Sequence, residues 1–494
     1  MKIFIFLFPF FLYALELAPL LTKPKSYVRD FYLTEFMRES NDSTLSYKAY
    51  SAMYKQKMKH LKILSKFPEF KPIYRCVNPS AKDIKKVDIA CLLNNGLWLS
   101  SIARLKNSDL RYLYENLPNG KEKEAVYAFL NDDFSKIFKN RELGYYFILN
   151  YPSKRIDQKI ENFSIFEDKY FKLFVKSAVL NDLPLIRTSL SELDYKKYAD
   201  EVKWWLFLNE MKFKNYKKAQ NILQSIKNKK SKEYFWLWLL SGKENYLEFL
   251  TKNPRINFYT LFAHEEKNVP FKIKNDIIFN SVKKPKYDQT NPWEVLKFWD
   301  EFKKREDLYN FAKELDSEKS IALKALVLDK ANRYKINYYI TPKMYNDNNI
   351  SFKAFVYAIA RQESRFIPAS VSRSYALGVM QMMPFLVRYM KGDGFNQFDY
   401  DENVKLSVKH QKWLFAKLKD PLMVAYAYNG GIGFVKRKVL PYFKYHGRFE
   451  PFLSMELVKY DESREYGKKV IANYIIYSHI FGDNNITLHK FLKR

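Results

Sequence analysis

Glycine is scarce and unevenly distributed in this chain, and this feature limits its possible folds most. The 494 residues include only 13 glycines, roughly a third of the usual share. Four lie before residue 350, and nine lie from Gly378 onward. No GxGxxG or GxxxxGK[ST] pattern occurs, which excludes a dinucleotide-binding fold and a P-loop. Sandwiches and barrels need more glycine-rich turns, so the sequence predicts an all-α protein.

Residues 27–340 show short amphipathic patterns separated by brief turns. Apolar and aromatic side chains at helical spacing predict two helices that meet near Lys214-Asn215 and a further pair that turns at Ser241-Gly242. Helix pairs of this size stack into α-solenoids. Because no strict repeat is present, we expect an irregular superhelical solenoid in which the aromatic residues form the core.

Two polar segments divide the chain. The first, Lys283–Pro292, contains two prolines, and the second, Thr341–Asn349, precedes the region where glycines return. The predicted organisation is therefore a signal peptide, an α-superhelical domain, a small helical linker domain and a C-terminal domain, over residues 1–18, 19–282, 283–344 and 345–494.

The N-terminus and the charge together suggest the compartment. One lysine precedes an apolar run, Ile3–Ala14, and small residues follow at Ala14 and Ala18, as in a secretory signal peptide. The run is too short to span a bilayer comfortably. The net charge of +31 favours an anionic partner. For an exported protein we expect the anionic cell wall rather than nucleic acid, a periplasmic location and no stable membrane insertion.

The cysteine and histidine patterns do not indicate a metal site. Cys76 and Cys91 fit no zinc or CxxC motif, and the six histidines are scattered without HExxH. We expect neither a metal nor another cofactor. The two cysteines are either free buried thiols or a disulfide, which would close a loop of about 15 residues and stabilise the fold by roughly 3 kcal/mol.

Glu363 is the candidate acid. An apolar stripe within Ser351–Phe366 predicts a helix with Ser351 at its N-cap, stopped by Pro368. Glu363 then lies in the last turn, where desolvation and the negative end of the helix dipole would raise its pKa. A carboxyl group that stays protonated near neutrality can act as a general acid.

Three further segments mix glycines, aromatic rings and polar side chains, a composition typical of a sugar-binding cleft. They are Ser372–Pro384, Tyr426–Gly433 and Met455–Val470. We expect Gly378, Gly430 and Gly431 to bring backbone close to a sugar.

These segments resemble the catalytic domain of soluble lytic murein transglycosylases, glycoside hydrolase family 23. The resemblance covers about residues 345–494 and is carried by four motifs in the family's order. The motifs are Ala360-Arg361-Gln362-Glu363-Ser364, Gly378-Val379-Met380-Gln381-Met382-Met383-Pro384, Ala427-Tyr428-Asn429-Gly430-Gly431 and Glu462-Ser463-Arg464-Glu465-Tyr466. The family also has a serine nine residues after the catalytic glutamate, which is Ser372 here.

Two positions depart from the family's pattern, because Tyr375 and Ser407 stand where glycines are common. Upstream, Asn257–Ala263 is similar to a segment that ends the family's superhelical domain. The resemblance implies a lysozyme-like catalytic fold, preceded by a ring-shaped superhelix and a small linker domain.

The resemblance also implies an activity. Glu363 would protonate the glycosidic oxygen between N-acetylmuramic acid and N-acetylglucosamine, assisted by the substrate's own N-acetyl group, and then take a proton from the muramoyl 6-hydroxyl. The product is a 1,6-anhydro sugar. The implied contacts are substrate binding by Ser372 and Gln381, a cleft-wall or core position at Met383, a hydrogen bond from Tyr428 near Glu363 or the acetamido group, a braced turn at Asn429, and a Glu462 that pairs with a cation such as Arg464 and shapes the cleft.

Three other functions stay open from the sequence. A lysozyme-type hydrolase would use the same cleft, a helical scaffold protein would carry an inactive catalytic domain, and DNA binding would rest on charge alone. Peptidoglycan glycan strands are the expected partner, with cell-wall synthesis or secretion machinery as further candidates. We expect a monomer.

Overall fold

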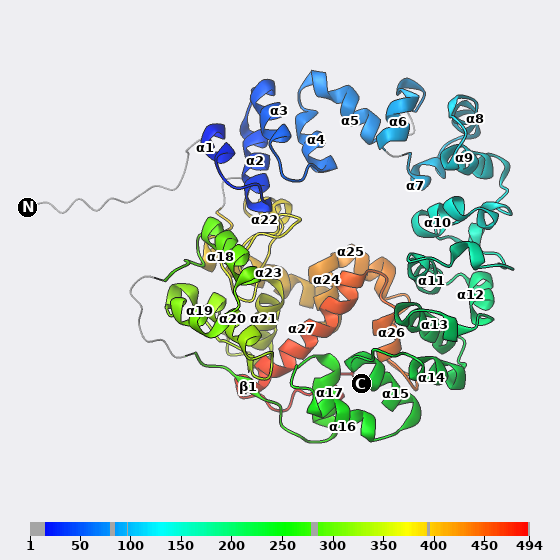
Figure 1. Ribbon diagram of the computed structural model, residues 1–494. Helices are drawn as coiled ribbons and strands as arrows, with labels where there is room; N and C mark the ends of the chain where they lie inside the picture. The colour runs from blue at the N-terminus through cyan, green and yellow to red at the C-terminus, as the bar shows by residue number, and fades with distance from the viewer. Residues whose placement is uncertain (1–14, 80–83, 96, 278–284, 393–395, 493–494) are drawn as a thin grey trace, which may run out of the picture. The chain divides into compact units, whose positions relative to one another are not determined.

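The computed structural model describes residues 15–79, 84–95, 97–277, 285–392 and 396–492. The described residues form 28 α-helices and one two-stranded sheet, so the all-α prediction is confirmed (Figure 1). They divide into two compact units. No helix within the described ranges is both long and apolar enough to cross a bilayer.

The first unit comprises residues 37–51 and the described part of 56–242. Its helices pack largely on their neighbours in sequence, as α8 does on α9 and α13 on α14. The α-helices that lie within it are α3 (Ser43–Ser51), α4 (Met58–Leu64), α5 (Lys71–Val77), α6 (Ile89–Asn95), α7 (Leu99–Ile102), α8 (Asn107–Asn116), α9 (Lys121–Asn131), α10 (Arg141–Asn150), α11 (Phe171–Leu180), α12 (Pro184–Ser191), α13 (Asp200–Lys212), α14 (Tyr216–Gln224) and α15 (Ser231–Ser241).

The predicted helix junctions in this unit are confirmed. Helix α13 ends and α14 begins on either side of Lys214-Asn215, and α15 ends at Ser241. Gly242 follows with a φ of 69°, the left-handed conformation that glycine adopts most easily. The aromatic residues form the core, as expected. Phe174 lies 4.8 Å from Phe166 and 5.7 Å from Phe138 between ring centroids, and all three side chains are buried.

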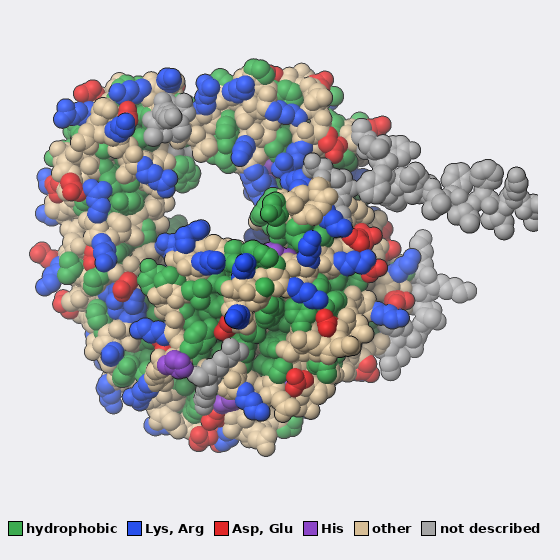
Figure 2. Space-filling view, turned by 180° about the vertical axis from the view of Figure 1, so that it is seen from behind, with side chains coloured by type: hydrophobic (Ala, Val, Ile, Leu, Met, Phe, Trp, Pro, Cys, Tyr) green, Lys and Arg blue, Asp and Glu red, His purple; other side chains and the backbone are tan. Residues whose placement is uncertain are grey.

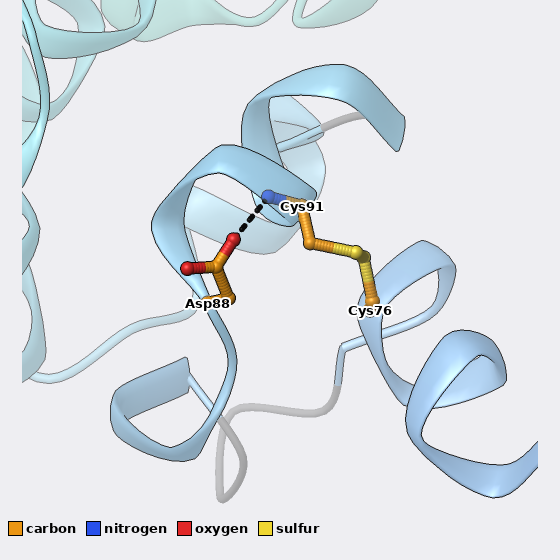
Figure 3. Close-up of a disulfide and its surroundings, with 3 residues drawn as sticks. All are labelled: Cys76, Asp88 and Cys91. Carbon is orange, nitrogen blue, oxygen red and sulfur yellow. Dashed lines mark hydrogen bonds between the residues drawn. A yellow bond between two sulfur atoms is a disulfide. The ribbon is translucent and has the colours of Figure 1, made fainter. Parts of the chain in front are cut away.

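Cys76 at the end of α5 and Cys91 in α6 are joined by a disulfide, with their Cα atoms 5.8 Å apart (Figure 3). The backbone N–H of Cys91 donates to Asp88 Oδ1 at 2.9 Å. That bond caps the first turn of α6 and so fixes the helix end that presents Cys91. Of the two states that the sequence left open, the structure has the bridge.

The second unit comprises described residues up to Phe36, residues 52–55 and described residues from Lys243 onward. Helix α27 packs against both α21 and α24. Strands β1 (Ile273–Lys274) and β2 (Asn337–Tyr338) pair in parallel. The helices are α1 (Leu17–Leu21), α2 (Tyr27–Glu39, which runs into the other unit), α16 (Asn245–Lys252), α17 (Phe258–Glu266), α18 (Pro292–Lys304), α19 (Leu308–Glu314), α20 (Ile321–Ala331), α21 (Ile350–Glu363), α22 (Pro384–Lys391), α23 (Tyr400–Leu418), α24 (Pro421–Gly430), α25 (Ile432–Phe434), α26 (Phe452–Glu456), α27 (Asp461–Ile480) and α28 (Leu488–Leu492).

The units differ from the predicted domains at residues 243–282, whose described part belongs with the C-terminal region. Helix α17 packs on α27 and α28. Its Tyr259 hydroxyl donates to Glu456, and Lys468 Nζ donates to the Tyr259 oxygen at 2.9 Å. The prediction placed this segment in the solenoid because the segment follows the solenoid helices directly in the sequence. Its partners Glu456 and Lys468 lie about 200 residues further along the chain.

The N-terminal segment also belongs to this unit. The apolar run of the predicted signal peptide lies outside the described residues. Cleavage after Ala14 would leave α1 intact, whereas cleavage after Ala18 would divide it. Helix α2 contacts the C-terminal region, since Glu35 lies 3.4 Å from Arg388 and the Phe31 ring lies 6.4 Å from that of Tyr375.

Candidate active site

Glu363 is the last residue of α21. The helix begins two residues earlier than predicted, because the side chain of Asn349, not Ser351, accepts a hydrogen bond from the Phe352 N–H at 3.0 Å. Asparagine and serine cap helices about equally well, so sequence preference could not decide between them. The Ser351 hydroxyl instead lies 2.5 Å from the Tyr474 hydroxyl.

The end of α21 is fixed by its surroundings rather than by Pro368. Arg365 and Phe366 have φ values of 54° and 69°, which end the helix directly after Glu363. Arg365 pairs with buried Asp329. Arg361 donates to the Tyr338 carbonyl at 2.7 Å. These bonds attach the helix end to α20 and β2, so the linker region holds the position of the acid.

Glu363 is partly exposed as a residue, and its carboxyl group accepts a hydrogen bond from the Tyr466 hydroxyl at 2.6 Å. Burial raises the pKa of Glu363 from 4.5 to about 8, the Tyr466 bond opposes the rise, and the negative charge of Glu462 adds to it. A carboxyl group in this state is protonated at neutral pH and can donate its proton to a bound substrate. The predicted general acid therefore has the electrostatics that its role needs.

The segment from Ser372 to Gln381 forms a tight loop after α21. Ser372 Oγ accepts from the Ala376 N–H at 2.9 Å and from the Ser374 N–H at 3.2 Å. Gln381 Nε2 donates to the carbonyls of Gly378 and Ser370, at 2.8 and 3.0 Å. Both predicted substrate-binding side chains thus brace the loop. The Ser372 hydroxyl can still donate its own proton to a ligand.

Asn403 on α23 holds this loop from behind. Its Oδ1 accepts from the Met380 N–H at 2.9 Å, and its Nδ2 donates to the carbonyls of Leu377 and Gln397. A Cβ on Gly378, whose φ is 81°, would lie 2.4 Å from Asn403 Nδ2. Glycine is needed there for contact with Asn403, so the expected approach to a sugar is not what the structure shows at Gly378.

The glycine pair Gly430-Gly431 ends α24 and leads into α25. A Cβ on Gly430 would lie 2.5 Å from the Phe434 ring, so this glycine serves internal packing. Among the described residues, no other atom lies within 4 Å of a Cβ built on Gly431. The backbone at Gly431 is therefore open, as the expected approach to a sugar requires.

Tyr428 and Asn429 reach the site from α24. The Tyr428 hydroxyl donates to the Met380 carbonyl at 2.7 Å and lies 2.8 Å from Ser407 Oγ. Burial and the negative charge of Glu363 raise the pKa of Tyr428, so the phenol lies near the acid. Ser407, which departs from the family's glycine, supplies a polar partner for Tyr428.

Asn429 joins α24 to α27. Its Nδ2 donates to Glu462 Oε1 at 3.2 Å, and its Oδ1 accepts from Ser463 Oγ at 2.7 Å. The predicted pair of Glu462 with Arg464 is wrong. Arg464 pairs with Asp461 and lies 3.9 Å from Glu465. On a helix, the side chain two residues from Glu462 points to another face.

One predicted contact, Met383, remains, and so do the acidic residues that follow Glu363 most closely in the sequence, Asp393, Asp399, Asp401 and Glu402. Met383 is partly exposed and precedes α22, as a cleft-wall residue would. Asp399 caps α23, and Glu402 lies 3.0 Å from Lys405. Asp393 lies outside the described residues. Among the described residues, no group of three His, Cys, Asp or Glu side chains could hold a metal ion.

Sequence reasoning did not single out Tyr466, Asn403 or Ser463, although they make the bonds that position Glu363, the loop and Asn429. Tyr466 and Ser463 stand within the quoted Glu462–Tyr466 motif, so that motif was the signal for two of them. Asn403 carried no signal of its own, because its partners in the loop come from another segment.

These features define a helical region in which the Glu363 carboxyl group is protonated at neutral pH and is suited to general acid chemistry. Residues 341–446 match the family model described as "Transglycosylase SLT domain". The chain therefore carries an SLT domain, and its C-terminal region is similar to soluble lytic transglycosylases.

Two further similarities concern individual proteins. The chain is 26% identical over 160 residues to the soluble lytic murein transglycosylase of Escherichia coli K12, which is 31% of this chain and 24% of that relative. The match thus spans about a quarter of the curated relative's length. The lytic transglycosylase Slt of Pseudomonas aeruginosa, solved as an inactive mutant, has 14% identity and a TM-score of 0.45, covering 92% of this chain and 79% of that one.

Proposed function

We propose that this protein is a lytic transglycosylase that cleaves the β-1,4 bond between N-acetylmuramic acid and N-acetylglucosamine in peptidoglycan. The observation that carries the proposal is the Glu363 carboxyl group, which is bonded to Tyr466 and protonated at neutral pH. The SLT domain match over residues 341–446, which include Glu363, supports it.

In the proposed reaction, Glu363 acts twice. Its proton goes to the glycosidic oxygen as the C1–O bond breaks, while the substrate's acetamido oxygen stabilises C1. Glu363, now a carboxylate, takes the proton of the 6-hydroxyl as that oxygen bonds to C1. The product carries a 1,6-anhydromuramoyl end, and no water is consumed. Tyr466 would stabilise the intermediate carboxylate through its hydrogen bond.

A lysozyme-type hydrolase is the second candidate, because Glu462 is a second carboxyl group near the acid. Its negative charge raises the pKa of Glu363 further, and ordinary glycosidases use a second carboxylate as nucleophile or base. Glu462 is, however, exposed and accepts a bond from Asn429. Digestion of sacculi distinguishes the two reactions by mass, since transglycosylase products are one water lighter. Reducing-end muropeptides from the parent would overturn the transglycosylase proposal.

The location follows as part of the same proposal. We place the protein in the periplasm, on the signal-like N-terminus and the net charge of +31. Figure 2 shows Lys and Arg side chains spread over the visible face and more frequent there than Asp and Glu. Such a surface attracts an anionic polymer. N-terminal sequencing of the mature protein tests the export.

A further inference from the structure

Tyr375 has an unusual backbone conformation in the loop between Ser372 and Gln381. Its N–H donates to the Ser372 carbonyl at 3.0 Å, and its φ of 70° lies in the left-handed region, which bulky residues rarely adopt. Glycine, which is common at this position in the family's pattern, adopts this conformation without strain. A tyrosine keeps it only where the surrounding structure holds the residue in place.

The structure that holds Tyr375 comes from the other end of the chain. Tyr375 is only 2% exposed, and its ring lies 6.4 Å from the Phe31 ring on α2. Burial and the negative charge of Asp30 raise the pKa of Tyr375, and a hydrogen bond with Thr34 opposes the rise. The phenol therefore lies against α2, and this contact offsets the strain of the left-handed backbone.

Helix α2 also contacts the two helices that follow the loop. Glu35 lies 3.4 Å from Arg388 on α22. The Phe31 ring lies 6.2 Å from that of Phe398, which directly precedes the cap of α23. Helix α23 carries Asn403, whose side chain holds the loop from behind. One helix thus reaches the loop and the start of each element that borders it.

Helix α2 is itself held firmly by the segment that follows α3. Asp30 is fully buried, and its carboxylate accepts from the N–H groups of Tyr54 and Lys55 at 2.7 and 2.8 Å. Arg29 is also buried and donates to the Ala52 carbonyl at 2.6 Å. This segment belongs to the same compact unit as the loop. Because α2 is anchored independently of the loop, it can act as a support for it.

The supported loop carries the two predicted substrate-binding side chains, Ser372 and Gln381. Ser372 Oγ accepts from the N–H of Ala376, the residue after Tyr375, at 2.9 Å. Tyr375 and Ala376 share a peptide group, so a backbone rotation at Tyr375 would move this N–H. The direction in which the Ser372 hydroxyl can donate to a ligand therefore depends on the conformation of Tyr375.

We propose that α2 is a positioning element of the candidate active site, which fixes the loop from Ser372 to Gln381 through the packing of Phe31 on Tyr375. The proposal rests on the proposed function, because the loop affects turnover only when a substrate lies beside Glu363. Fixing the loop in advance holds its polar groups in place and avoids the entropic cost of ordering them when substrate binds.

The first test measures order in the loop and needs no substrate. It compares Phe31→Ala with Tyr32→Ala, a matched control on the same helix, since the Tyr32 ring stacks on Trp293 of α18 at 5.7 Å. Amide hydrogen exchange is read by mass spectrometry on the folded full chain. We expect residues 372–382 to exchange about tenfold faster in Phe31→Ala and at the parental rate in Tyr32→Ala.

The second test measures turnover of sacculi by the same proteins. Phe31→Ala should lose about tenfold in kcat/KM, while the alkaline limb of its pH profile, which reports Glu363, stays in place. Tyr32→Ala should turn over like the parent. Tyr375→Phe keeps the ring contact and should keep most of the activity, whereas Tyr375→Gly should lose as much as Phe31→Ala.

The other outcomes contradict the proposal. Equal effects of Phe31→Ala and Tyr32→Ala would mean that α2 contributes only general stability. Unchanged loop exchange in Phe31→Ala, or faster exchange with parental turnover, would remove the link between α2 and catalysis. A shifted alkaline limb would mean that α2 acts on the acid, and parental turnover in Tyr375→Gly would mean that the ring contact is not needed. If the parent cleaves no sacculi, the proposed function fails, and the exchange experiment alone decides whether α2 orders the loop.

Discussion

The helices of the two units pack in different ways. In the unit of residues 37–51 and 56–242, helices pack mostly on their sequence neighbours, such as α13 on α14. In the second unit, α21 packs on α27, about 100 residues later, and α17 packs on α27 from upstream. The first kind of packing needs only apolar stripes. The second brings together polar side chains that are distant in sequence, and the candidate site is made there.

The largest expected effect is on the proposed activity of the second unit. Glu363→Gln should lower turnover of sacculi about 10³-fold, because it removes the acid and the base together. Helical content and binding of sacculi should persist. Turnover like that of the parent would mean that Glu363 is not the acid.

The same variant reports the pKa of Glu363. Its folded pKa of about 8 exceeds the ordinary 4.5, so the stability that the protonated carboxyl contributes is present below 4.5 and declines as pH rises toward 8. Glu363→Gln should therefore gain stability over the parent across this window. If the melting temperatures of variant and parent differ by the same amount at pH 4 and at pH 8, the shift is contradicted.

The next effect tests the bond between α26 and α27 that also holds α17. Lys468 lies 3.1 Å from Glu456, and both are almost fully buried. Lys468→Met should cost about 3–5 kcal/mol of unfolding free energy, because Glu456 keeps an uncompensated charge. Denaturant unfolding measures the loss. Glu456→Met/Lys468→Met should recover much of it, and a double variant as unstable as the single one would contradict this explanation.

The two units can be compared directly through one tightly packed glycine in each. A Cβ on Gly467 would lie 2.2 Å from the Tyr426 ring, and one on Gly144 would lie 2.6 Å from the Phe166 ring. Each alanine variant should lose about 1–3 kcal/mol of unfolding free energy through overpacking. Only Gly467→Ala should also lower the kcat of the folded protein, because Gly467 follows Tyr466. An equal loss of kcat in Gly144→Ala would remove the distinction.

The smallest effect concerns the hydrogen bond to the acid. Tyr466→Phe removes the bond that lowers the pKa of Glu363, so the alkaline decline of kcat/KM should move to higher pH, with about a tenfold loss of rate. Tyr477→Phe is the matched control on α27, since its hydroxyl donates to the Ile340 carbonyl at 3.0 Å. A shift of equal size in both variants would contradict the role of Tyr466.

The sequence predicted the local features well. Periodicity placed the helices and the junctions near Lys214-Asn215 and Gly242, and the motif around Glu363 placed the acid at a helix end. Prediction failed where several side chains compete for one role. The cap of α21 is Asn349 rather than Ser351, and Glu462 bonds Asn429 rather than Arg464.

By itself, the sequence determined that the chain is helical and that Glu363 lies at the end of a helix, because apolar spacing and chain breaks are local properties. Tertiary structure decided that Tyr466 bonds Glu363, that Gln381 turns inward and that α17 belongs to the second unit. Those outcomes depend on burial and on partners up to about 200 residues away. The pKa of Glu363 depends on the combined effects of burial and of these neighbours, which no local sequence pattern specifies.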